Sequence, residues 1–466
     1  MTKDKKLIYG IDDKPPFFTS LALGAQHVLT LFGATTLVPL LLGPMIFGAD
    51  NTAAISGFVS NIYLGMGIAT IIQLFLGSRL PIVQGSSFAF ITPIGAIAAI
   101  VLANGGDPNS VMQVLAGALI AGGIIEVFIG YSGLVGKLKK IITPIVIGPT
   151  IMLIGFSLFD VAVSSNAAKY WPVSLAVVAG IFIFSLIVKN RIRLFPVLFS
   201  VVIVYMLCLV LSKLGIFSSG HPAYVDLTKI RSSVWFHIPG IFPYGLPVFR
   251  VSAILTILAA YFASIIESIG DYHSVSFAAG AGDPSAKTIS RGIGAEGLGC
   301  IINGILGASG ATSYTENIGL ISISKVASRY VVLFGAAILI VLSFFSKLGA
   351  VVATMPAPII GGAYIALFGV IGALGIQILT RADMTSHRNI MIVGFSFLMG
   401  LGIGRWMPGF YLANPNCFGA GCIAVLCWDI IAAVFSTPMA VGGLSALILD
   451  NLLPGTPEER GILNQS

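Results

Sequence analysis

One segment of the chain, SGATSYTENIG (residues 309–319), begins with small and polar residues and becomes apolar near its end. A second segment, GSSFAFITPIG (residues 85–95), has the same order. Both are too polar and too short for ordinary membrane spans, and backbone left unpaired in lipid costs roughly several kcal/mol per group. We therefore expect two extended breaks, each followed by a helix that begins near Pro93 or near Asn317, with free amide N–H groups and positive helix ends facing a polar site at mid-membrane. The alternative is two structural re-entrant breaks without ligand contact.

The composition predicts a membrane protein. Of the 466 residues, 56% are hydrophobic and only 9% are charged, whereas a soluble domain carries roughly 25% charged residues. The formal net charge of +7 comes from scattered short clusters, which argues against nucleic acid as a partner. The five cysteines lack zinc or disulfide spacing and are expected to be packing residues. The charged N-terminus has no cleavable apolar core, so we expect no signal peptide.

Fourteen candidate spans follow from a length of about 20 apolar residues per straight helix. They are 18–42, 53–77, 86–103, 111–135, 141–163, 172–188, 195–212, 251–278, 292–307, 312–328, 331–346, 351–379, 389–404 and 421–449. With a cytoplasmic N-terminus, 18 of the 25 Lys and Arg residues lie on the inner side and seven on the outer side. This distribution predicts a multi-pass protein of the plasma or inner membrane with both termini in the cytoplasm.

The polar connector at 213–250 divides the spans into two groups of seven. The predicted parts are a cytoplasmic N-terminus (1–17), a first repeat (18–212), the external connector (213–250), a second repeat (251–450) and a cytoplasmic C-terminus (451–466). Because each half has an odd number of spans, the second half has the opposite orientation in the membrane. The expected fold class is an all-α polytopic membrane protein of two inverted seven-helix repeats with short extended breaks in spans three and ten.

Buried acids are the second signal, because ionisable groups within a membrane are expensive and usually functional. Glu267 and Asp271 lie four residues apart on one face of span eight. Glu267 is the deeper and the stronger candidate, whereas Asp271 either binds an ion or only orients a neighbour. Glu316 stands at the break in span ten. For Glu126 in span four and Asp429 in span fourteen we expect structural hydrogen bonds.

Other polar residues interrupt apolar spans. Gln26 and His27 do so in span one, the inverted counterpart of span eight, so His27 either lies near the site or is a hydrogen-bonded packing residue. The pair Arg405 and Trp406 precedes a loop with Pro and Gly, which is typical of an interface anchor.

These motifs resemble the nucleobase-ascorbate transporter family. Its signature in span ten is Gln, Glu or Pro followed by N-x-G, four residues, then Thr or Ser, and residues 316–325 read ENIGLISISK, with Ser324 in place of the usual Thr. Gln26 and His27 resemble the Gln-His pair of the family's first span, and GSSF (85–88) resembles its break in span three. The resemblance covers nearly the whole chain.

The resemblance implies a core domain of spans 1–4 and 8–11 and a gate domain of spans 5–7 and 12–14, with a homodimer formed through the gate. It implies a site between spans three, eight and ten, where Glu267 and Glu316 accept hydrogen bonds from the ring N–H groups of a nucleobase and the backbone near Phe88 and Tyr314 meets its carbonyls and ring face. The expected substrate-binding residues are Glu267, Glu316, Phe88, Ser87, Tyr314, Thr315 and Asn317.

The substrate and the coupled cation stay open at this point. Glu316 resembles bacterial uracil carriers and some plant members, whereas bacterial xanthine carriers usually have Gln there and ascorbate carriers Pro. The sequence ESIGDY (267–272) resembles animal and plant members. We therefore prefer uracil or a purine such as xanthine to ascorbate. Coupling by a proton would use Glu267, assisted by His27. Coupling by sodium would use Asp271 and nearby backbone carbonyls.

Two further function classes fit the sequence less well. An anion transporter on the same fold would need a basic group facing the two helix ends, where the chain has Glu316. A membrane enzyme would need a metal-ligand cluster, a nucleophile with a base or a Gly-rich phosphate loop, and the sequence has none of these motifs. We therefore predict a secondary transporter with an elevator motion of core against gate, no enzymatic activity and no cofactor.

Overall fold

The computed structural model describes residues 7–135, 141–188, 195–414 and 422–462; within these ranges, the side chains of Glu316 and Asp429 are among those it leaves undescribed. The described part is mostly helical. Its main elements are α1 (Phe17–Phe47), α2 (Thr52–Phe75), β1 (Gln84–Ser86), η1 (Phe88–Phe90), α3 (Ile91–Ala103), α4 (Pro108–Tyr131), α6 (Pro144–Ser157), α7 (Phe159–Ala162), η2 (Ala167–Lys169), α8 (Trp171–Phe182), η3 (Ile183–Ile187), α9 (Pro196–Lys213), α10 (Leu227–Ser232), α11 (Val251–Ala278), α12 (Ala286–Ile305), β2 (Ala311–Ser313), α13 (Thr315–Ser324), α14 (Arg329–Ser343), α15 (Ser346–Ala353), α16 (Ala357–Leu379), α17 (His387–Ala413), α18 (Cys422–Phe435) and α19 (Pro438–Leu452).

The helices agree with the predicted membrane spans. In the described ranges, seven helices are long and apolar enough to cross a membrane, and α1 makes eight if its two halves, bent by 43°, form one span. Each of the fourteen predicted spans coincides with one or more helices. Several predicted boundaries are wrong, among them that of the span at 351–379, which covers the end of α15 and all of α16. The span at 421–449 is two helices, because Pro438 begins α19 and cannot continue α18, and α17 runs to Ala413 instead of ending at 404.

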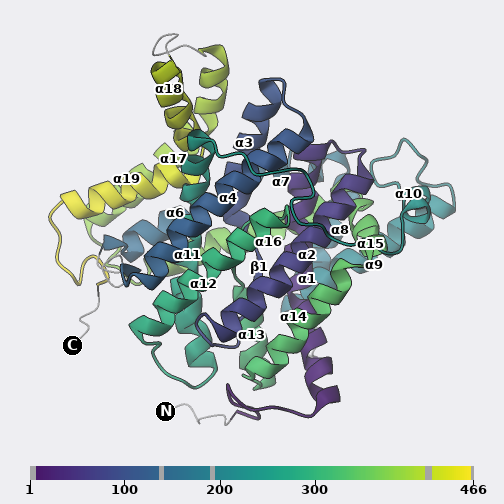
Figure 1. The fold of residues 1–466 in the computed structure, drawn as a ribbon, viewed down its shortest axis with the longest axis horizontal. Coiled ribbons are helices and arrows are strands. Elements are labelled where there is room, and N and C mark those ends of the chain that lie inside the picture. The colour runs from purple at the N-terminus through teal and green to yellow at the C-terminus, as the bar shows by residue number, and fades with distance from the viewer. Residues whose placement is uncertain (1–6, 136–140, 189–194, 415–421, 463–466) are drawn as a thin grey trace.

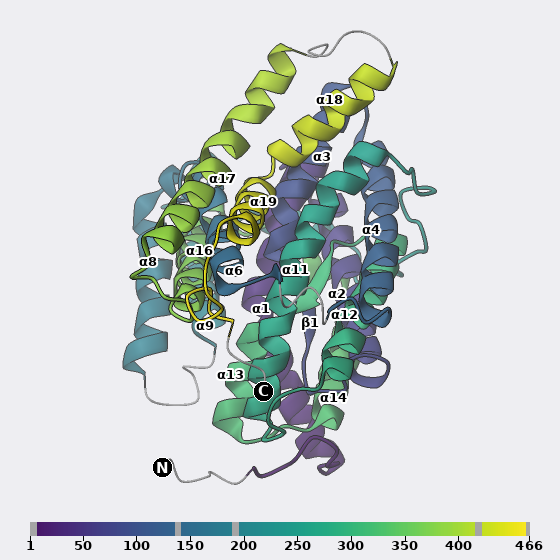
Figure 2. The same ribbon diagram turned by 90° about the vertical axis from the view of Figure 1, so that its left-hand side faces the viewer.

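The two broken spans lie in the interior of the bundle. In Figures 1 and 2, β1 lies in the middle of the molecule, surrounded by helices from both halves of the sequence, while α17 and α18 project together at one end. The most extensive helix packing joins α4 to α12, α6 to α16, α2 to α14 and α17 to α19. The α4–α12 contact depends on glycine, because a Cβ atom on Gly123 would lie 2.7 Å from the carbonyl oxygen of Gly297.

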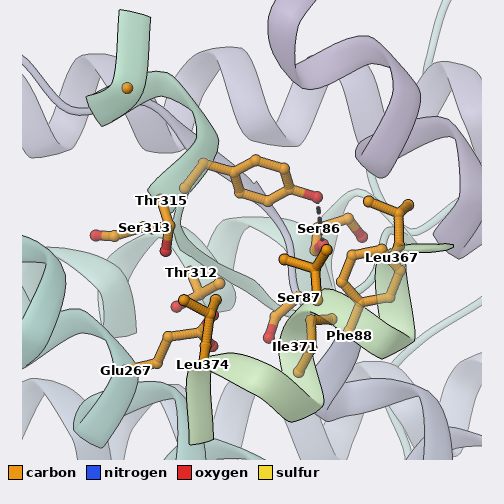
Figure 3. A pocket seen from close by; sticks show the side chains of 13 residues that line it. Ser86, Ser87, Phe88, Glu267, Thr312, Ser313, Thr315, Leu367, Ile371 and Leu374 are labelled. Atoms are coloured by element: carbon orange, nitrogen blue, oxygen red, sulfur yellow. Dashed lines mark hydrogen bonds between the residues drawn. The ribbon is translucent and has the colours of Figure 1, made fainter. Parts of the chain in front are cut away.

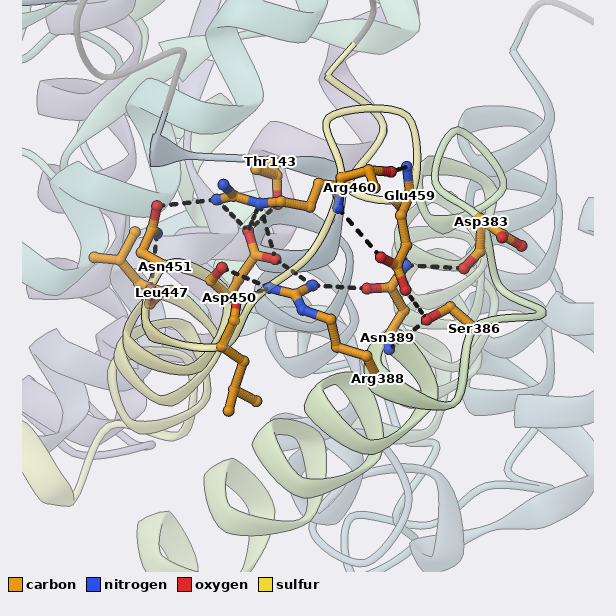
Figure 4. A network of polar contacts seen from close by, with 12 residues as sticks. Thr143, Asp383, Ser386, Arg388, Asn389, Leu447, Asp450, Asn451, Glu459 and Arg460 are labelled. Carbon is orange, nitrogen blue, oxygen red and sulfur yellow. Dashed lines mark hydrogen bonds and ion pairs between the residues drawn. The ribbon is translucent and has the colours of Figure 1, made fainter.

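A polar network ties the C-terminal segment to three helices (Figure 4). Asp450, near the end of α19, is fully buried and forms ion pairs of 2.9 Å with both Arg388 of α17 and Arg460. The hydroxyl of Thr143, at the start of α6, donates a 2.8 Å hydrogen bond to the same carboxylate. The network therefore fixes the relative positions of α6, α17 and α19 at their shared end.

Candidate functional site

The two predicted breaks form a short antiparallel ribbon. In β1 and β2, Gln84 pairs with Ser313, Gly85 with Thr312, and Ser86 with Ala311. The pairing continues on both sides, where the N–H of Ser87 donates to the carbonyl of Gly310 (3.0 Å) and that of Tyr314 donates to Val83 (3.0 Å). Extended breaks in spans three and ten are thus confirmed. The expectation of free strand amides was wrong for Gln84, Ala311 and Ser313, whose N–H groups donate to Thr70 Oγ1, Cys300 Sγ and Glu296 Oε1.

Each strand leads directly into a helix. After β1, the turn η1 is followed by α3, and after β2, α13 begins at Thr315. Tyr314 precedes α13 without a side-chain hydrogen bond to its first turn. Two helix N-termini, with their positive dipole ends, therefore start beside the ribbon, close to where the sequence predicted them.

A cavity of about 280 Å³ lies against this ribbon (Figure 3). Glu267 of α11 projects into the same space as Ser87 and Phe88, while apolar side chains of α16 form the opposite wall. The lining residues are Ser86, Ser87, Phe88, Glu267, Thr312, Ser313, Tyr314, Thr315, Gly319, Leu367, Val370, Ile371 and Leu374. One carboxylate, several hydroxyls and two aromatic rings thus meet in a small, largely apolar space.

The aromatic side chains are fixed by close contacts. The Tyr314 hydroxyl donates a 2.9 Å hydrogen bond to the carbonyl of Ser86, and a Cβ atom on Gly85 would lie only 2.0 Å from the Tyr314 ring. The Phe88 ring packs edge-on against Phe368, with centroids 5.7 Å apart. Gly85 therefore allows the ring of one broken span to lie on the backbone of the other.

Five of the seven residues predicted to bind substrate line this cavity: Glu267, Ser87, Phe88, Tyr314 and Thr315. Glu316 is the second residue of α13, and its side chain lies outside the described part of the structure. Asn317 does not line the cavity. Its amide nitrogen donates to the carbonyl of His27 (3.1 Å) and lies 3.1 Å from His27 Nδ1, so it joins α13 to α1.

The predicted cation-coupling residues occupy different places. His27 is buried in the bundle against Asn317 and is not a lining residue of the cavity. Asp271 lies one helical turn beyond Glu267, and its Oδ1 accepts a 2.8 Å hydrogen bond from the hydroxyl of Thr315, which does line the cavity. In the described ranges, no group of three or more His, Cys, Asp and Glu side chains could hold a metal ion.

Glu296, which was not among the predicted site residues, is the main hydrogen-bond acceptor beside the ribbon. Its Oε1 accepts hydrogen bonds from the backbone N–H of Ser313 (3.0 Å) and from the hydroxyls of Ser268 (2.7 Å) and Tyr272 (2.9 Å). Glu296 belongs to α12 and is 1% exposed. Its hydrogen bonds join β2 to α11 and α12. The sequence did contain a signal for Glu296, because it is an acid among the glycines of predicted span nine. Acids within a membrane are usually functional.

Several expectations away from the cavity need correction. Neither carboxyl oxygen of Glu126 has a hydrogen-bond partner among the described residues, so the structural hydrogen bonds expected for it were wrong. The side chain of Asp429 is not among those that the structure describes.

The predicted interface anchor, Arg405 and Trp406, lies within α17 rather than before a loop. Arg405 forms an ion pair of 2.9 Å with Asp160, and the Trp406 ring is exposed. Cys208 and Cys300 are buried free thiols, as expected for packing residues.

Comparison with known sequences decides the family. The sequence pattern of the permease family matches residues 18–409. The chain belongs to the nucleobase-ascorbate transporter family. Solute carrier family 23 member 1 of Rattus norvegicus is 36% identical across 98% of this chain and 82% of its own length. Nucleobase-ascorbate transporter 11 of Arabidopsis thaliana is 30% identical across 97% of this chain and 70% of its own length.

Solved structures of distant relatives establish the same fold. The transmembrane domain of the cyanobacterial bicarbonate transporter BicA aligns with 91% of this chain and 99% of its own at 15% identity, with a TM-score of 0.56. The murine anion transporter Slc26a9 in its inward-facing state aligns with 84% of this chain and 66% of its own at 12% identity, with a TM-score of 0.57. The chain is an all-α membrane protein of two inverted seven-span repeats, and it is a transporter, not an enzyme.

Proposed function

We propose that this transporter imports a nucleobase, either uracil or a purine such as xanthine, together with a cation. The observation that carries the proposal is the Glu267 carboxylate on the wall of the cavity beside the β1–β2 ribbon. A nucleobase presents alternating N–H and C=O groups on a planar ring. A carboxylate accepts hydrogen bonds from N–H groups, and the hydroxyls of Ser87, Thr312 and Thr315 can donate to ring carbonyls or accept from further N–H groups.

The remaining walls suit the faces of a flat ring. Phe88 and Tyr314 lie on the ribbon side, and Leu367, Ile371 and Leu374 lie on the α16 side. The cavity of about 280 Å³ is close to the lower limit of ordinary ligand pockets, about 300 Å³, which favours a small substrate. Glu316 completes the proposed set, as the resemblance of its motif implies.

Ascorbate and inorganic anions are the alternative substrates. The family name covers ascorbate, and the distant structural relatives carry bicarbonate or other anions. Ascorbate and bicarbonate are both anions at neutral pH, and the described residues that line the cavity include Glu267 but no Lys, Arg or His. Repulsion between like charges in a low-dielectric site disfavours both.

We further propose a proton as the coupled cation and an elevator motion as the transport mechanism. The cavity lies between the ribbon, contributed by the proposed core, and α16 of the proposed gate, and a second cavity of about 330 Å³ shares Gly319, Leu367 and Val370 with it. Sliding of core against gate would carry the ribbon and its substrate across the membrane. Dimerisation through the gate and insertion in the plasma or inner membrane, with both termini in the cytoplasm, belong to the same proposal.

Sodium is the alternative cation. Asp271, with the hydroxyl of Thr315 beside it, would offer oxygen ligands next to the substrate. Uptake of labelled uracil and xanthine into proteoliposomes, driven separately by an inward pH gradient and an inward sodium gradient, distinguishes the two cations. Accumulation of a base under the pH gradient alone supports the proposal. Accumulation under sodium alone overturns proton coupling, and uptake of ascorbate without uptake of either base overturns the substrate.

A further inference from the structure

Glu126 is a buried acid that the proposed binding site does not use. It lies in the second half of α4, is 1% exposed, and has no hydrogen-bond partner for either carboxyl oxygen among the described residues. An ionised carboxylate in such surroundings is strongly disfavoured, because burial removes its water and nothing replaces it. In this conformation Glu126 is therefore the neutral, protonated acid.

The contact between α4 and α12 brings this acid next to Glu296. Cβ atoms on Gly123 and Gly297 would each lie 2.7 Å from the opposite helix backbone, so the turns that carry Glu126 and Glu296 touch. A charge on Glu296 also acts electrostatically on Glu126. Two adjacent carboxyl groups in a low-dielectric interior do not both ionise readily, and their titrations are linked.

Of the two acids, only Glu296 has hydrogen-bond donors among the described residues. Its Oε1 accepts the hydrogen bonds from Ser268, Tyr272 and Ser313 described above, whereas its Oε2 has no partner among the described residues. Several donors directed at one oxygen stabilise the carboxylate form. A negative charge is therefore better accommodated on Glu296 than on Glu126.

A chain of hydrogen bonds leads from this pair to the cavity. Glu296 Oε1 lies 2.7 Å from the Ser268 hydroxyl, which lies 3.1 Å from the hydroxyl of Thr312 on the cavity wall. Ser313, also on that wall, donates to Glu296 through its backbone N–H. A proton that enters with water at the cavity thus has a path of hydroxyl groups as far as Glu296, whereas no hydrogen bond among the described residues joins Glu296 to Glu126.

The helices packed against α4 carry charges of both signs. Besides Glu296, α12 has Lys287 and Arg291, and Arg291 acts electrostatically on Tyr131 at the end of α4. The ionisable residues of α11 are Glu267, Asp271, His273, Tyr261 and Tyr272. The neighbouring α3 contains no ionisable side chain. In α1 the sequence offers only His27, which is bonded to Asn317. No ion pair joins Glu126 to a basic side chain among the described residues, so a proton can neutralise it.

We propose that Glu126 is the group that binds and releases the transported proton, with Glu296 linking its charge state to the cavity wall. This inference deepens, and rests on, the proposed proton symport. With the cavity open to the outside, a proton from solution converts the Glu126 carboxylate to the acid; after the motion, the acid returns that proton to water on the inside. Removal of the proton places two negative charges behind β2, which weakens the arrangement that holds Thr312 and Ser313 and so lowers substrate affinity.

The test uses Glu126→Gln and Glu126→Met, which both imitate the neutral acid, in proteoliposomes supplied with labelled uracil or xanthine. Both variants are expected to fold, because no hydrogen bond to Glu126 is lost. They should exchange labelled for unlabelled base across the membrane but lose accumulation driven by an inward pH gradient, and their exchange should no longer vary with pH. Asp107→Asn, an acid-to-amide change at the exposed start of the same helix, is the matched control and should accumulate base like the native protein.

Three results would overturn the role of Glu126. The first is gradient-driven accumulation by both variants at the native level, since Glu126 would then stay protonated throughout the cycle. The second is loss of exchange in folded variants, and the third is failure of both variants to fold. If the native protein accumulates no base under a pH gradient, proton symport itself is wrong, and the role of Glu126 with it. If the native protein does accumulate base and one of the three results above is found, only the role of Glu126 is wrong.

Discussion

The Oε1 atom of Glu296 accepts a 3.0 Å hydrogen bond from the backbone N–H of Ser313, so an acid of α12 holds the central strand of a broken span. Ser313 lines the cavity, whereas Glu296 stands behind it. Glu296 is therefore a positioning residue. It does not line the cavity itself, but it fixes the position of β2, whose residues do.

Replacing Glu296 tests this positioning role. Glu296→Gln keeps the shape but removes the charge, and hydrogen bonds to charged groups contribute about 1.5–3 kcal/mol against about 1 kcal/mol for neutral ones. We expect a lower melting temperature in detergent, by several degrees, and weaker binding of base. Thermal unfolding with and without base measures both effects. An unchanged melting temperature together with unchanged binding would contradict the role of Glu296.

Gly85 tests the close approach of the two broken spans. Gly85→Ala places a Cβ atom 2.0 Å from the Tyr314 ring, which must then move away from the cavity. We expect loss of base binding with the protein still folded. Gly57→Ala in α2 is the matched control, since its Cβ atom would meet nothing within 4 Å. Equal binding by the two variants would show that the Tyr314 ring does not shape the site.

The network at Asp450 predicts a large effect on stability. Asp450→Asn leaves Arg388 and Arg460 without their shared carboxylate, and breaking a buried ion pair costs about 3–5 kcal/mol. The melting temperature should fall markedly. Asp50→Asn is the comparison, because Asp50 is fully exposed in its contact with Lys229 and exposed pairs contribute about 0–1 kcal/mol. Similar melting temperatures for the two variants would rule out a stabilising role for the network.

Asp271 separates proton coupling from sodium coupling. Asp271→Asn keeps an oxygen that accepts from Thr315 but removes the negative charge that a sodium ion would need. Since we propose proton coupling, uptake driven by a pH gradient should persist in this variant. Selective loss of uptake in Asp271→Asn, restored by raising external sodium, would instead assign the cation site to Asp271.

The sequence predicted the elements of the site better than their contacts. Polar, short segments at 85–95 and 309–319 can satisfy their backbone in lipid only as breaks within a bundle, and the structure has them as paired strands. That they would pair with one another does not follow from either segment alone. The pairing depends on Gly85 and on the distant Glu296, whose contacts arise only when α12 packs on α4 and α11.

The acids show the same limit. Glu267 was recognisable as a deep charge in an otherwise apolar span, and it does line the cavity. Glu126 has the same sequence signal but lies behind the ribbon without a hydrogen-bond partner in the described ranges. Periodicity assigns a residue to a helix, whereas the neighbouring helices determine what the side chain meets.

Equilibrium binding of labelled uracil and xanthine to the purified native protein and to Glu267→Gln tests the central claim most directly. The native protein should bind one of these bases. Loss of the charge that accepts its N–H groups should weaken binding at least about tenfold, since about 1.5 kcal/mol or more is lost. Equal affinity in the two proteins, or native protein that binds ascorbate or bicarbonate but neither base, would contradict the account.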